Sequence, residues 1–377
     1  MNKYFKIRIF QPIVPEYRVA LFDGLCEIYG DRLEVVASKG CGEDVSYPLM
    51  VAKHDYSHGF LKLGSLLWQK RMSLKGLDKG DVVVVSGDIH QLSSILLAIR
   101  AKIKGVKVVW WAHHWSARGK TMRAKLRLAI AKHLADVYLC YTRTGAALLS
   151  NIGFESKRVF FTGNTINFLP ICKAIENWPT AKLRAFQQKN SLIGKNIILV
   201  CGVIRKKMRL DQLFLALKHK MIADMDVYVV IIGDGPERDS CETLARDLDL
   251  TERIIWVGAT RNQEVMAPWF LSASIFVYPG PIGLSIFHAM AYGLPVITHG
   301  NANSQLPEYE AMETDVTGLT FIENDVGDLA LKIRHLLEYE GERNAMSFAA
   351  KKKVVEQYSM QAMIANFQNA IETCANI

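Results

Sequence analysis

Short apolar runs that alternate with longer helical stretches constrain this chain more than any other feature. Most of the runs lack strict apolar–polar alternation, which is typical of parallel strands buried on both faces. Helical segments such as residues 91–104 and 285–292 lie between them, and this order predicts βαβ units around parallel sheets. The runs cover residues 6–10, 32–38, 81–87, 106–114, 136–142, 158–163, 195–202, 226–235, 253–258, 274–280 and 294–300.

The series of strands is interrupted once, over residues 165–194, which contain Pro170 and Pro179 and have little strand character. A length of 377 residues suits two domains. We therefore predict an α/β protein with two doubly wound, Rossmann-like domains, residues 1–180 and 195–377, with an inter-domain connection at 165–194 and with the last helix a candidate to pack back on the first domain. Ligands of such sheets bind at the carboxyl ends of the strands, so the prediction places them in a cleft between the domains.

The charge balance favours an anionic partner, because the formal net charge is +9. Nucleic acid, a nucleotide and an anionic membrane surface all satisfy that balance. We disfavour nucleic acid, because no RNA- or DNA-binding motif accompanies the charge. Seven cysteines without a CxxC pair, an N-terminus that lacks a leader-like apolar segment, and no apolar run long enough to span a bilayer predict a cytoplasmic protein.

The segment 276–310 carries the pattern that points most directly to a ligand-binding site. A predicted strand ends at Tyr278, and a turn-rich loop with Gly280 and Gly283 follows it. A helix is expected to begin at Leu284 or Ser285. A glycine loop that opens a helix presents free N–H groups and a positive dipole end, which suits a phosphate. An ordinary strand–loop–helix turn is the alternative.

The stretch YPGPIGLSIFHAMAYGLPVI (278–297) resembles the motif of GT-B-fold retaining glycosyltransferases of family 4, also called glycosyl transferase group 1. The segments GDGPE (233–237), WVGAT (256–260) and LPE (306–308), together with Asn164, are similar to further parts of that family. The opening residues 11–25 resemble members that build surface polysaccharides. The resemblance implies a GT-B fold and a metal-independent, hexosyltransferase-type enzyme without a cofactor. Such an enzyme moves a sugar from a nucleotide-diphosphate donor to a glycan or lipid-linked acceptor, with retention, in polysaccharide or lipopolysaccharide biosynthesis.

The same stretch departs from the family at its two glutamates, whose positions hold Gly280 and His288. Gly280 offers no side chain, whereas a ring nitrogen of His288 could bond a ribose or phosphate oxygen. Glu308 is the remaining carboxylate of this region, and the resemblance implies that it binds the ribose. The alternatives are that His288 is a helix histidine packed into the wall of the site and that Glu308 is a surface acid. The donor-binding residues that the resemblance implies are Gly202, Lys206, Gly258, Gly280, Ile282, Gly283, Leu284, His288 and Glu308.

A basic segment, CGVIRKKMRLDQL (201–213), follows the first strand of the second series. Charge builds on the diphosphate when a sugar–nucleotide bond breaks, and fixed cations stabilise it. The family's arginine and lysine positions hold Val203 and Met208, so we predict that Arg205 and Lys207 do this catalytic work from shifted positions. A solvated basic turn is the alternative.

In the first domain, the strand that ends at WWAHHW (110–115) supplies two histidines. The resemblance implies that a histidine here contacts the donor sugar. We select His114 as the catalytic candidate and place His113, Tyr17 and Arg18 on the acceptor side; a buried, hydrogen-bonded core histidine is the alternative. Asp88 fits a helix N-cap better than a base.

A cationic stretch over residues 117–133 suggests contact with an anionic membrane, at the inner face if the protein is cytoplasmic. The charges fall on both sides of the expected helix, so it shows no clean amphipathic face. The acidic turns 224–226 and 247–249 are interpreted as solvated rather than metal-binding. Because the glutamate pair is missing, a nucleotide-sugar epimerase or a catalytically impaired sugar-binding homologue is the alternative to a transferase.

Overall fold

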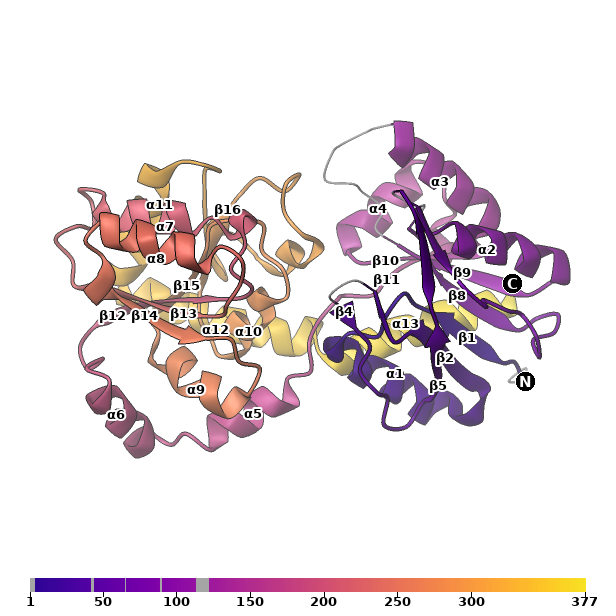
Figure 1. The fold of residues 1–377 in the computed structure, drawn as a ribbon, viewed down its shortest axis with the longest axis horizontal. Coiled ribbons are helices and arrows are strands. Elements are labelled where there is room, and N and C mark those ends of the chain that lie inside the picture. The colour runs from indigo at the N-terminus through magenta and orange to yellow at the C-terminus, as the bar shows by residue number, and fades with distance from the viewer. Residues whose placement is uncertain (1–3, 42–43, 65, 89, 113–121) are drawn as a thin grey trace. The chain divides into compact units, whose positions relative to one another are not determined.

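The computed structural model describes residues 4–41, 44–64, 66–88, 90–112 and 122–377. The chain divides into two compact units, Met1–Thr165 with Met360–Ile377, and Ile166–Ser359 (Figure 1). Each unit is built around its own parallel sheet. The predicted α/β class is therefore confirmed.

The sheet of the first unit has seven strands in the described residues, and every pairing between them is parallel. Two short antiparallel pairs lie outside it, β3 (Gly40–Cys41) with β4 (Asp44–Val45) and β6 (Phe60–Leu63) with β7 (Leu66–Gln69). In sheet order the strands are β11 (Val159–Phe161), β10 (Val137–Cys140), β9 (Lys107–Trp111), β8 (Val82–Ser86), β1 (Ile7–Phe10), β2 (Leu33–Ser38) and β5 (Lys53–His58).

Helices cover both faces of this sheet, and the strand sequences show why. Successive side chains of a strand point to opposite faces, and β8 has valine at four positions in a row. Val82 and Val84 pack with α1 (Glu16–Tyr29) and α13 (Met360–Asn376). Val83 and Val85 pack with α2 (Leu92–Lys104), α3 (Met122–Leu134) and α4 (Arg143–Asn151). A run of valines without polar alternation is thus what a strand buried on both faces requires.

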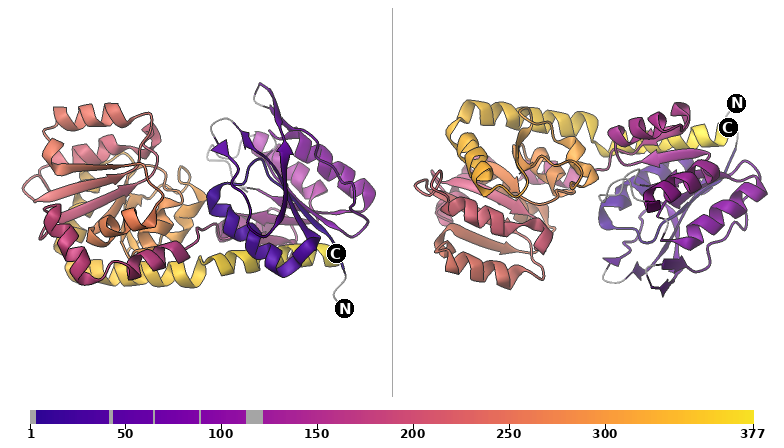
Figure 2. Two further views of the ribbon diagram at one scale, coloured as in Figure 1. Left: turned by 60° about the horizontal axis from the view of Figure 1, so that its bottom comes forward. Right: turned by 90° about the horizontal axis from the view of Figure 1, so that it is seen from above.

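The last helix belongs to the first unit. Phe367 of α13 is fully buried, and its ring meets Trp111 edge-on at 4.7 Å between centroids. Figure 2 shows α13 running along the first unit's sheet next to α1.

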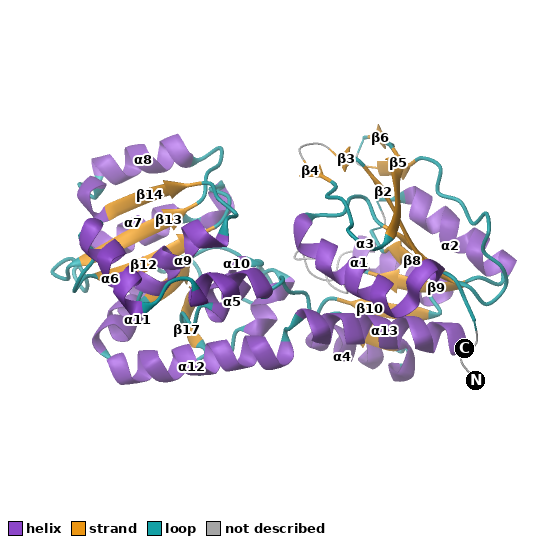
Figure 3. Cartoon of the chain, turned by 90° about the horizontal axis from the view of Figure 1, so that it is seen from below, coloured by secondary structure: helices purple, strands orange, loops and turns teal. Residues whose placement is uncertain are grey.

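The second unit has a six-stranded, fully parallel sheet in which the strand order reverses once (Figure 3). Its order is β14 (Ile254–Gly258), β13 (Val227–Ile232), β12 (Asn196–Cys201), β15 (Ile275–Tyr278), β16 (Val296–His299) and β17 (Gly318–Phe321). From β12 the chain moves outward to β13 and β14, then returns to the other side of β12 with β15. The direction in which the chain adds strands to the sheet therefore reverses between β12 and β15.

The helices of the second unit also form two groups. One group joins α7 (Leu210–Lys218) to α8 (Arg238–Asp247) and α11 (Val326–Glu338). In the other, α9 (Gln263–Ser272) contacts α5 (Leu169–Glu176) and α6 (Thr180–Lys189), and α10 (Ser285–Ala291) contacts α12 (Glu340–Gln357).

Residues 166–194, which the sequence analysis placed between the domains, lie in the second unit as α5 and α6. Aromatic contacts hold them there. Phe186 meets Trp178 and Trp269 edge-on, with centroids 5.5 and 4.8 Å apart, and Trp178 Nε1 donates to the carbonyl of Glu264 at 3.2 Å. The boundary of the compact units falls at Thr165, and these half-buried rings pack the segment against α9.

Candidate functional site

The reversal of strand order in the second unit marks one place on its sheet. The loops after β12 and β15 leave neighbouring strands at the same edge of the sheet. One leads to α7 and the other to α10, which belong to the two different groups of helices. In open α/β sheets ligands bind at this switch point, outside the carboxyl ends of the strands. Two of the predicted segments, residues 202–209 and 279–284, are these loops. We call them the β12 loop and the β15 loop.

The two loops are in backbone contact. The amide of Gly280 donates to the carbonyl of Met208 at 3.1 Å. A Cβ atom at Gly280 would lie only 1.8 Å from the carbonyl oxygen of Lys207. The departure from the family's glutamate at this position therefore has a physical reason, because no side chain fits at Gly280 unless the basic loop moves.

The β12 loop is held on its other side by the loop after β13. A Cβ atom at Gly233 would lie 1.9 Å from the Gly202 carbonyl oxygen, and one at Gly235 would lie 2.3 Å from that of Ile204. Ile204 and Met208 are both fully buried. Glycines on the two neighbouring loops thus allow the β12 loop to pack at backbone distance, and two apolar side chains anchor it.

This anchored loop carries three exposed cations, Arg205, Lys206 and Lys207. The last two begin the 3-10 turn η3 (Lys206–Met208). No ion pair joins any of the three to another residue in the part of the chain that the structure describes. Arg209, by contrast, bonds Asp211 and also donates to Asn324 Oδ1 at 2.6 Å. An anchored backbone at the switch point therefore carries positive side chains that are open to a solute.

A buried amide that the sequence analysis missed fixes the β15 loop. Gln305 Oε1 accepts from the amide of Ile282 at 2.7 Å, and its Nε2 donates to Thr298 Oγ1 at 3.1 Å and to the carbonyl of His299 at 2.8 Å. Thr298 Oγ1 also donates to the carbonyl of Gly280 at 3.3 Å. The only signal in the sequence is a glutamine two residues before Pro307, and nothing there distinguishes it from an exposed loop residue.

His288, on α10, makes both of its ring nitrogens part of an internal network. Its Nε2 accepts from Gln263 Nε2 at 3.4 Å, which leaves the proton of the neutral ring on Nδ1, and the ring also forms a hydrogen bond with the backbone of Leu284. Gln263 Oε1 in turn accepts from Tyr292 OH at 3.1 Å. Burial lowers the pKa of His288 to about 4, so the ring is neutral at pH 7. In this arrangement His288 reaches a ribose only if Gln263 moves.

The remaining predicted donor residues lie along the same edge of the sheet. Ile282 is fully buried, and a Cβ atom at Gly283 would lie 3.2 Å from Leu306 Cδ1. Leu284 is the N-cap residue of α10, and half-buried Glu308 lies in the 3-10 turn η5 (Pro307–Ala311). Gly258 ends β14, two strands from β12, with a φ of +86° and open space where a Cβ atom would be.

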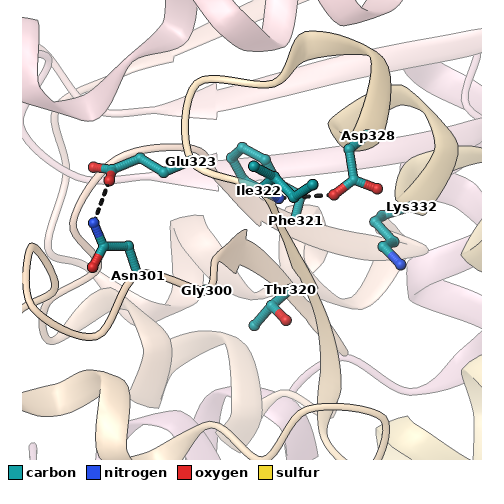
Figure 4. Close-up of a pocket in the computed structure, with 8 residues that line it drawn as sticks. All are labelled: Gly300, Asn301, Thr320, Phe321, Ile322, Glu323, Asp328 and Lys332. Carbon is teal, nitrogen blue, oxygen red and sulfur yellow. Dashed lines mark hydrogen bonds between the residues drawn. The ribbon is translucent and has the colours of Figure 1, made fainter.

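A pocket of about 660 Å³ opens further along this edge, at the ends of β16 and β17 (Figure 4). The carboxylate of Glu323 accepts there from Asn301 Nδ2 at 2.6 Å and from Ser304 Oγ at 2.9 Å. These bonds, led by that of Asn301, hold the pKa of Glu323 below its usual value. The acid is thus engaged within the fold. The pocket is lined by Gly300, Asn301, Thr320, Phe321, Ile322, Glu323, Asp328 and Lys332.

In the first unit, Arg18 is buried at the carboxyl edge of the sheet. Its Nη1 donates to Gln11 Oε1 at 2.6 Å and its Nη2 to Tyr141 OH at 2.8 Å. The guanidinium lies 4.2 Å from the ring centroid of Trp111. Neighbouring Tyr17 is half-buried on the same helix, α1.

Three further predictions concern the first unit and possible metal ligands. His113 and His114 lie outside the described residues. Asp88 does not cap α2, whose N-cap is Gln91; its carboxylate accepts from the amide of His90 at 2.9 Å instead. Among the described residues, no group of three or more His, Cys, Asp or Glu side chains is placed to hold a metal ion.

Comparison with known proteins finds matches to the second unit. Residues 182–353 match the family model "Glycosyl transferases group 1". An uncharacterized glycosyltransferase of Methanocaldococcus jannaschii is 26% identical over 168 residues, which is 44% of this chain and 42% of that protein. The N-acetyl-alpha-D-glucosaminyl L-malate synthase of Bacillus anthracis is 23% identical over 175 residues, 46% and 45% of the two chains. The matched segment thus spans less than half the length of these relatives.

A crystal structure of Anabaena HepE in complex with UDP superposes with a TM-score of 0.73 at 14% identity, over 98% of this chain and all of the other. This likeness shows the fold, which is GT-B. The resemblance of the second half to group 1 glycosyltransferases is confirmed by the family match.

Proposed function

We propose that this chain, whose second unit carries a group 1 glycosyltransferase domain, moves a sugar from a nucleotide-diphosphate donor to a glycan or lipid-linked acceptor. One observation carries the proposal. Three exposed cations are fixed by glycine contacts at the switch point of the sheet, within the segment that matches the family. Retention at the anomeric carbon and a place in polysaccharide or lipopolysaccharide synthesis are parts of the proposal that the resemblance supports.

The chemistry assigned to Arg205 and Lys207 is stabilisation of the leaving diphosphate. Negative charge grows on the β-phosphate as the glycosidic bond to the donor breaks. Cations held in position before the reaction need no reorganisation, and one such group is typically worth about 3 kcal/mol of barrier. An arginine suits bidentate contact with phosphate oxygens, and a lysine supplies a point charge. These side chains supply the positive charge, so the proposal includes no metal ion and no other cofactor.

The remaining donor contacts follow from the loops. Gly202, Lys206, Ile282, Gly283 and Leu284 surround the proposed position of the phosphates. We assign Gly258 to the side of the nucleotide base, at the end of β14, and Glu308 to the ribose. His288 has its ring nitrogens engaged by Leu284 and Gln263, so we assign it to the wall beneath the donor unless Gln263 moves.

The first unit is assigned to the acceptor, with Tyr17, Arg18 and His113 on that side and His114 directed to the donor sugar. The buried guanidinium of Arg18, stacked on Trp111, is the described feature that supports this assignment. The proposal also places the protein in the cytoplasm, at the inner face of a membrane. No helix in the described residues is long and apolar enough to cross a bilayer.

A second candidate function rests on the missing carboxylates. Gly280 and His288 stand where the family has its glutamate pair, which favours a nucleotide-sugar epimerase or an impaired sugar-binding homologue. Product analysis separates these activities from transfer, because an epimerase yields a new nucleotide sugar and no free nucleoside diphosphate.

A panel of UDP-, GDP-, ADP- and TDP-sugars, read by thermal shift, tests the donor site. A ligand that binds only the folded state raises its stability by about 2.7 kcal/mol at one hundred times its dissociation constant. We expect one nucleotide class to raise the melting temperature and to release its nucleoside diphosphate when acceptor glycan is added. If no nucleotide sugar shifts the melting temperature at millimolar concentration, the proposed function is wrong.

A further inference from the structure

One stretch of the first unit holds all of the chain's excess positive charge. No acidic residue lies between Asp88 and Asp136, whereas the chain as a whole has 37. The rest of the chain is therefore close to neutral, although the formal net charge is +9. The cations of this stretch are Arg100, Lys102, Lys104, Lys107, Arg118, Lys120, Arg123, Lys125, Arg127 and Lys132.

The fold gathers much of this stretch on one side of the sheet. Helices α2 and α3 contact each other and cover the same face (Figure 1). Leu97 and Ala101 of α2 and Ala131 of α3 pack inward against that face. The opposite sides of both helices point away from the sheet.

Those outward sides are apolar as well as basic. On α2, the outward residues Leu92, Ile99 and Ile103 recur at helical spacing, and Ile103 is 82% exposed. On α3, Met122 is 80% exposed and Leu126, one turn later, is 56% exposed. Single exposed apolar side chains are ordinary, whereas several of them on two adjacent helices are typical of an interaction surface.

The same two helices carry three exposed cations, Arg100 on α2 and Lys125 and Lys132 on α3. None of the three forms an ion pair with a residue that the structure describes. Lys102 is different, because its Nζ bonds Asp136 Oδ1 at 2.8 Å. The charges of α3 fall on both of its sides when that helix is considered alone. The apolar part of the surface becomes visible only when α2 is placed beside it.

We propose that this surface, which we call the α2–α3 face, docks on an anionic lipid membrane. The face is defined by Leu92, Ile99, Arg100, Ile103, Met122, Lys125, Leu126 and Lys132. Lysine and arginine interact with anionic headgroups, while aliphatic side chains enter the boundary between headgroups and acyl chains. A nucleic acid would use the same cations, but it would leave Ile103 and Met122 in water, and the apolar side chains therefore favour lipid.

This inference extends the proposed function, since it places a transferase where a lipid-linked acceptor would be found. Vesicle binding needs neither donor nor acceptor, however. If the protein responds to nucleotide sugar but does not bind vesicles, the docking face alone is overturned. If it binds vesicles but does not respond to nucleotide sugar, the donor site alone is overturned.

Co-sedimentation of the full chain with vesicles tests the proposal. We expect binding to phosphatidylglycerol–phosphatidylcholine vesicles, little binding to pure phosphatidylcholine, and weakening as salt is raised. Absence of binding to the anionic vesicles at low salt would overturn the proposal. So would a single-stranded oligonucleotide that binds more tightly than the vesicles and does not respond to substitution of Ile103.

Two double variants separate the charge from the apolar component. Each lysine removed near the surface should lower the partition coefficient about five-fold. Lys125→Glu with Lys132→Glu changes the charge by four, because each reversal counts twice, and should therefore lower the coefficient at least a hundred-fold. Ile103→Ser with Met122→Ser should lower it at least ten-fold. Unchanged partitioning of either double variant would contradict the assignment of this face.

The second unit offers a matched control on α12. Phe348 is 72% exposed, and Lys351 and Lys352 are exposed beside it. Phe348→Ser combined with Lys351→Glu and Lys352→Glu changes similar chemistry and should leave vesicle binding within two-fold. Every variant is checked for an unaltered melting temperature and an unaltered thermal shift with nucleotide sugar, so that loss of binding is not mistaken for loss of the fold.

Discussion

The chain has two basic regions whose settings differ. In the second unit, Arg205, Lys206 and Lys207 lie on a loop at the carboxyl edge of the sheet, held between glycines of the loops on either side. In the first unit, Arg100, Lys125 and Lys132 lie on the outward sides of helices, among exposed aliphatic residues. The backbone that carries the first set is held between neighbouring loops, whereas the second set lies on the outer surface of two helices.

The difference teaches that charge alone does not identify a ligand. Cations fixed at strand ends can stabilise charge that develops at one point, as on a leaving diphosphate. Cations spread over a partly apolar helical face suit an extended anionic surface. If this contrast is correct, substitutions that break the contacts of this edge should lower stability and donor binding, whereas loss of an exposed cation from it should lower activity alone. The following changes test these two expectations.

The largest effect is expected at Gly280. Restoring the family's glutamate with Gly280→Glu places a side chain where a Cβ atom would already be 1.8 Å from the Lys207 carbonyl oxygen. We expect a loss of about 3 kcal/mol in the free energy of unfolding, together with loss of the thermal shift caused by nucleotide sugar. Urea denaturation and the same shift assay measure both quantities.

Gly341→Ala is the matched control, because Gly341 lies in α12 with open space where its Cβ atom would be. It should change the free energy of unfolding by no more than about 1 kcal/mol. A Gly280→Glu protein that is as stable as the unaltered one would show that the two loops are not locked together.

Arg205→Ala should lower kcat/KM about a hundred-fold, because it removes one preorganised donor to the diphosphate. Stability should not change, since Arg205 is exposed. Steady-state transfer assays and a melting curve distinguish the two effects. Lys218→Ala, at the far end of α7, alters an equally exposed cation and should leave both values unchanged. Equal activity in the two variants would remove Arg205 from the site.

The pH dependence of folding should report His288. Its pKa is about 4 in the folded protein against 6.5 for an ordinary histidine, so the unfolded chain takes up the proton first as the pH falls. The stability contributed by the neutral ring is fully present above pH 6.5 and is lost toward pH 4, by about 2 kcal/mol at pH 5. His288→Gln should abolish this component between pH 7 and pH 5.

Denaturation at several pH values measures the effect. His133→Gln, at an exposed position of α3, serves as the control and should keep the pH profile of the unaltered protein. A His288→Gln profile identical to that of the unaltered protein would mean that the ring is not desolvated.

The smallest effect is expected at Gln305. Gln305→Leu leaves the amide of Ile282 and the carbonyl of His299 without their buried partner, which should cost about 1 to 2 kcal/mol. The affinity for the donor should also fall, because the β15 loop loses the hydrogen bond between Gln305 and the amide of Ile282. Asn303→Ala, at an exposed position two residues earlier, should stay within about 0.5 kcal/mol. Thermal denaturation with and without nucleotide sugar compares the two.

The sequence by itself determined the architecture and the position of the candidate site. Runs such as VVVV at 82–85 predict strands buried on both faces, because an unbroken apolar run leaves no side for water. The motif at 278–297 placed the proposed donor site in the second half, because glycines and small residues at fixed spacings can be recognised in the sequence without knowledge of the fold. The sequence placed an inter-domain connection at 165–194, whereas residues 166–194 belong to the second unit, where their aromatic residues pack on α9.

Only the tertiary structure decided how the site is held. That Gly280 must be glycine depends on Lys207, that Gln305 is buried depends on Thr298 and His299, and that His288 is neutral depends on Gln263 and Leu284. The apolar α2–α3 face likewise required two helices to be placed side by side. Periodicity reports which side of an element is buried, because burial repeats along the chain. It does not report which residue from another element lies opposite, because that distance is set by the order of strands in the sheet.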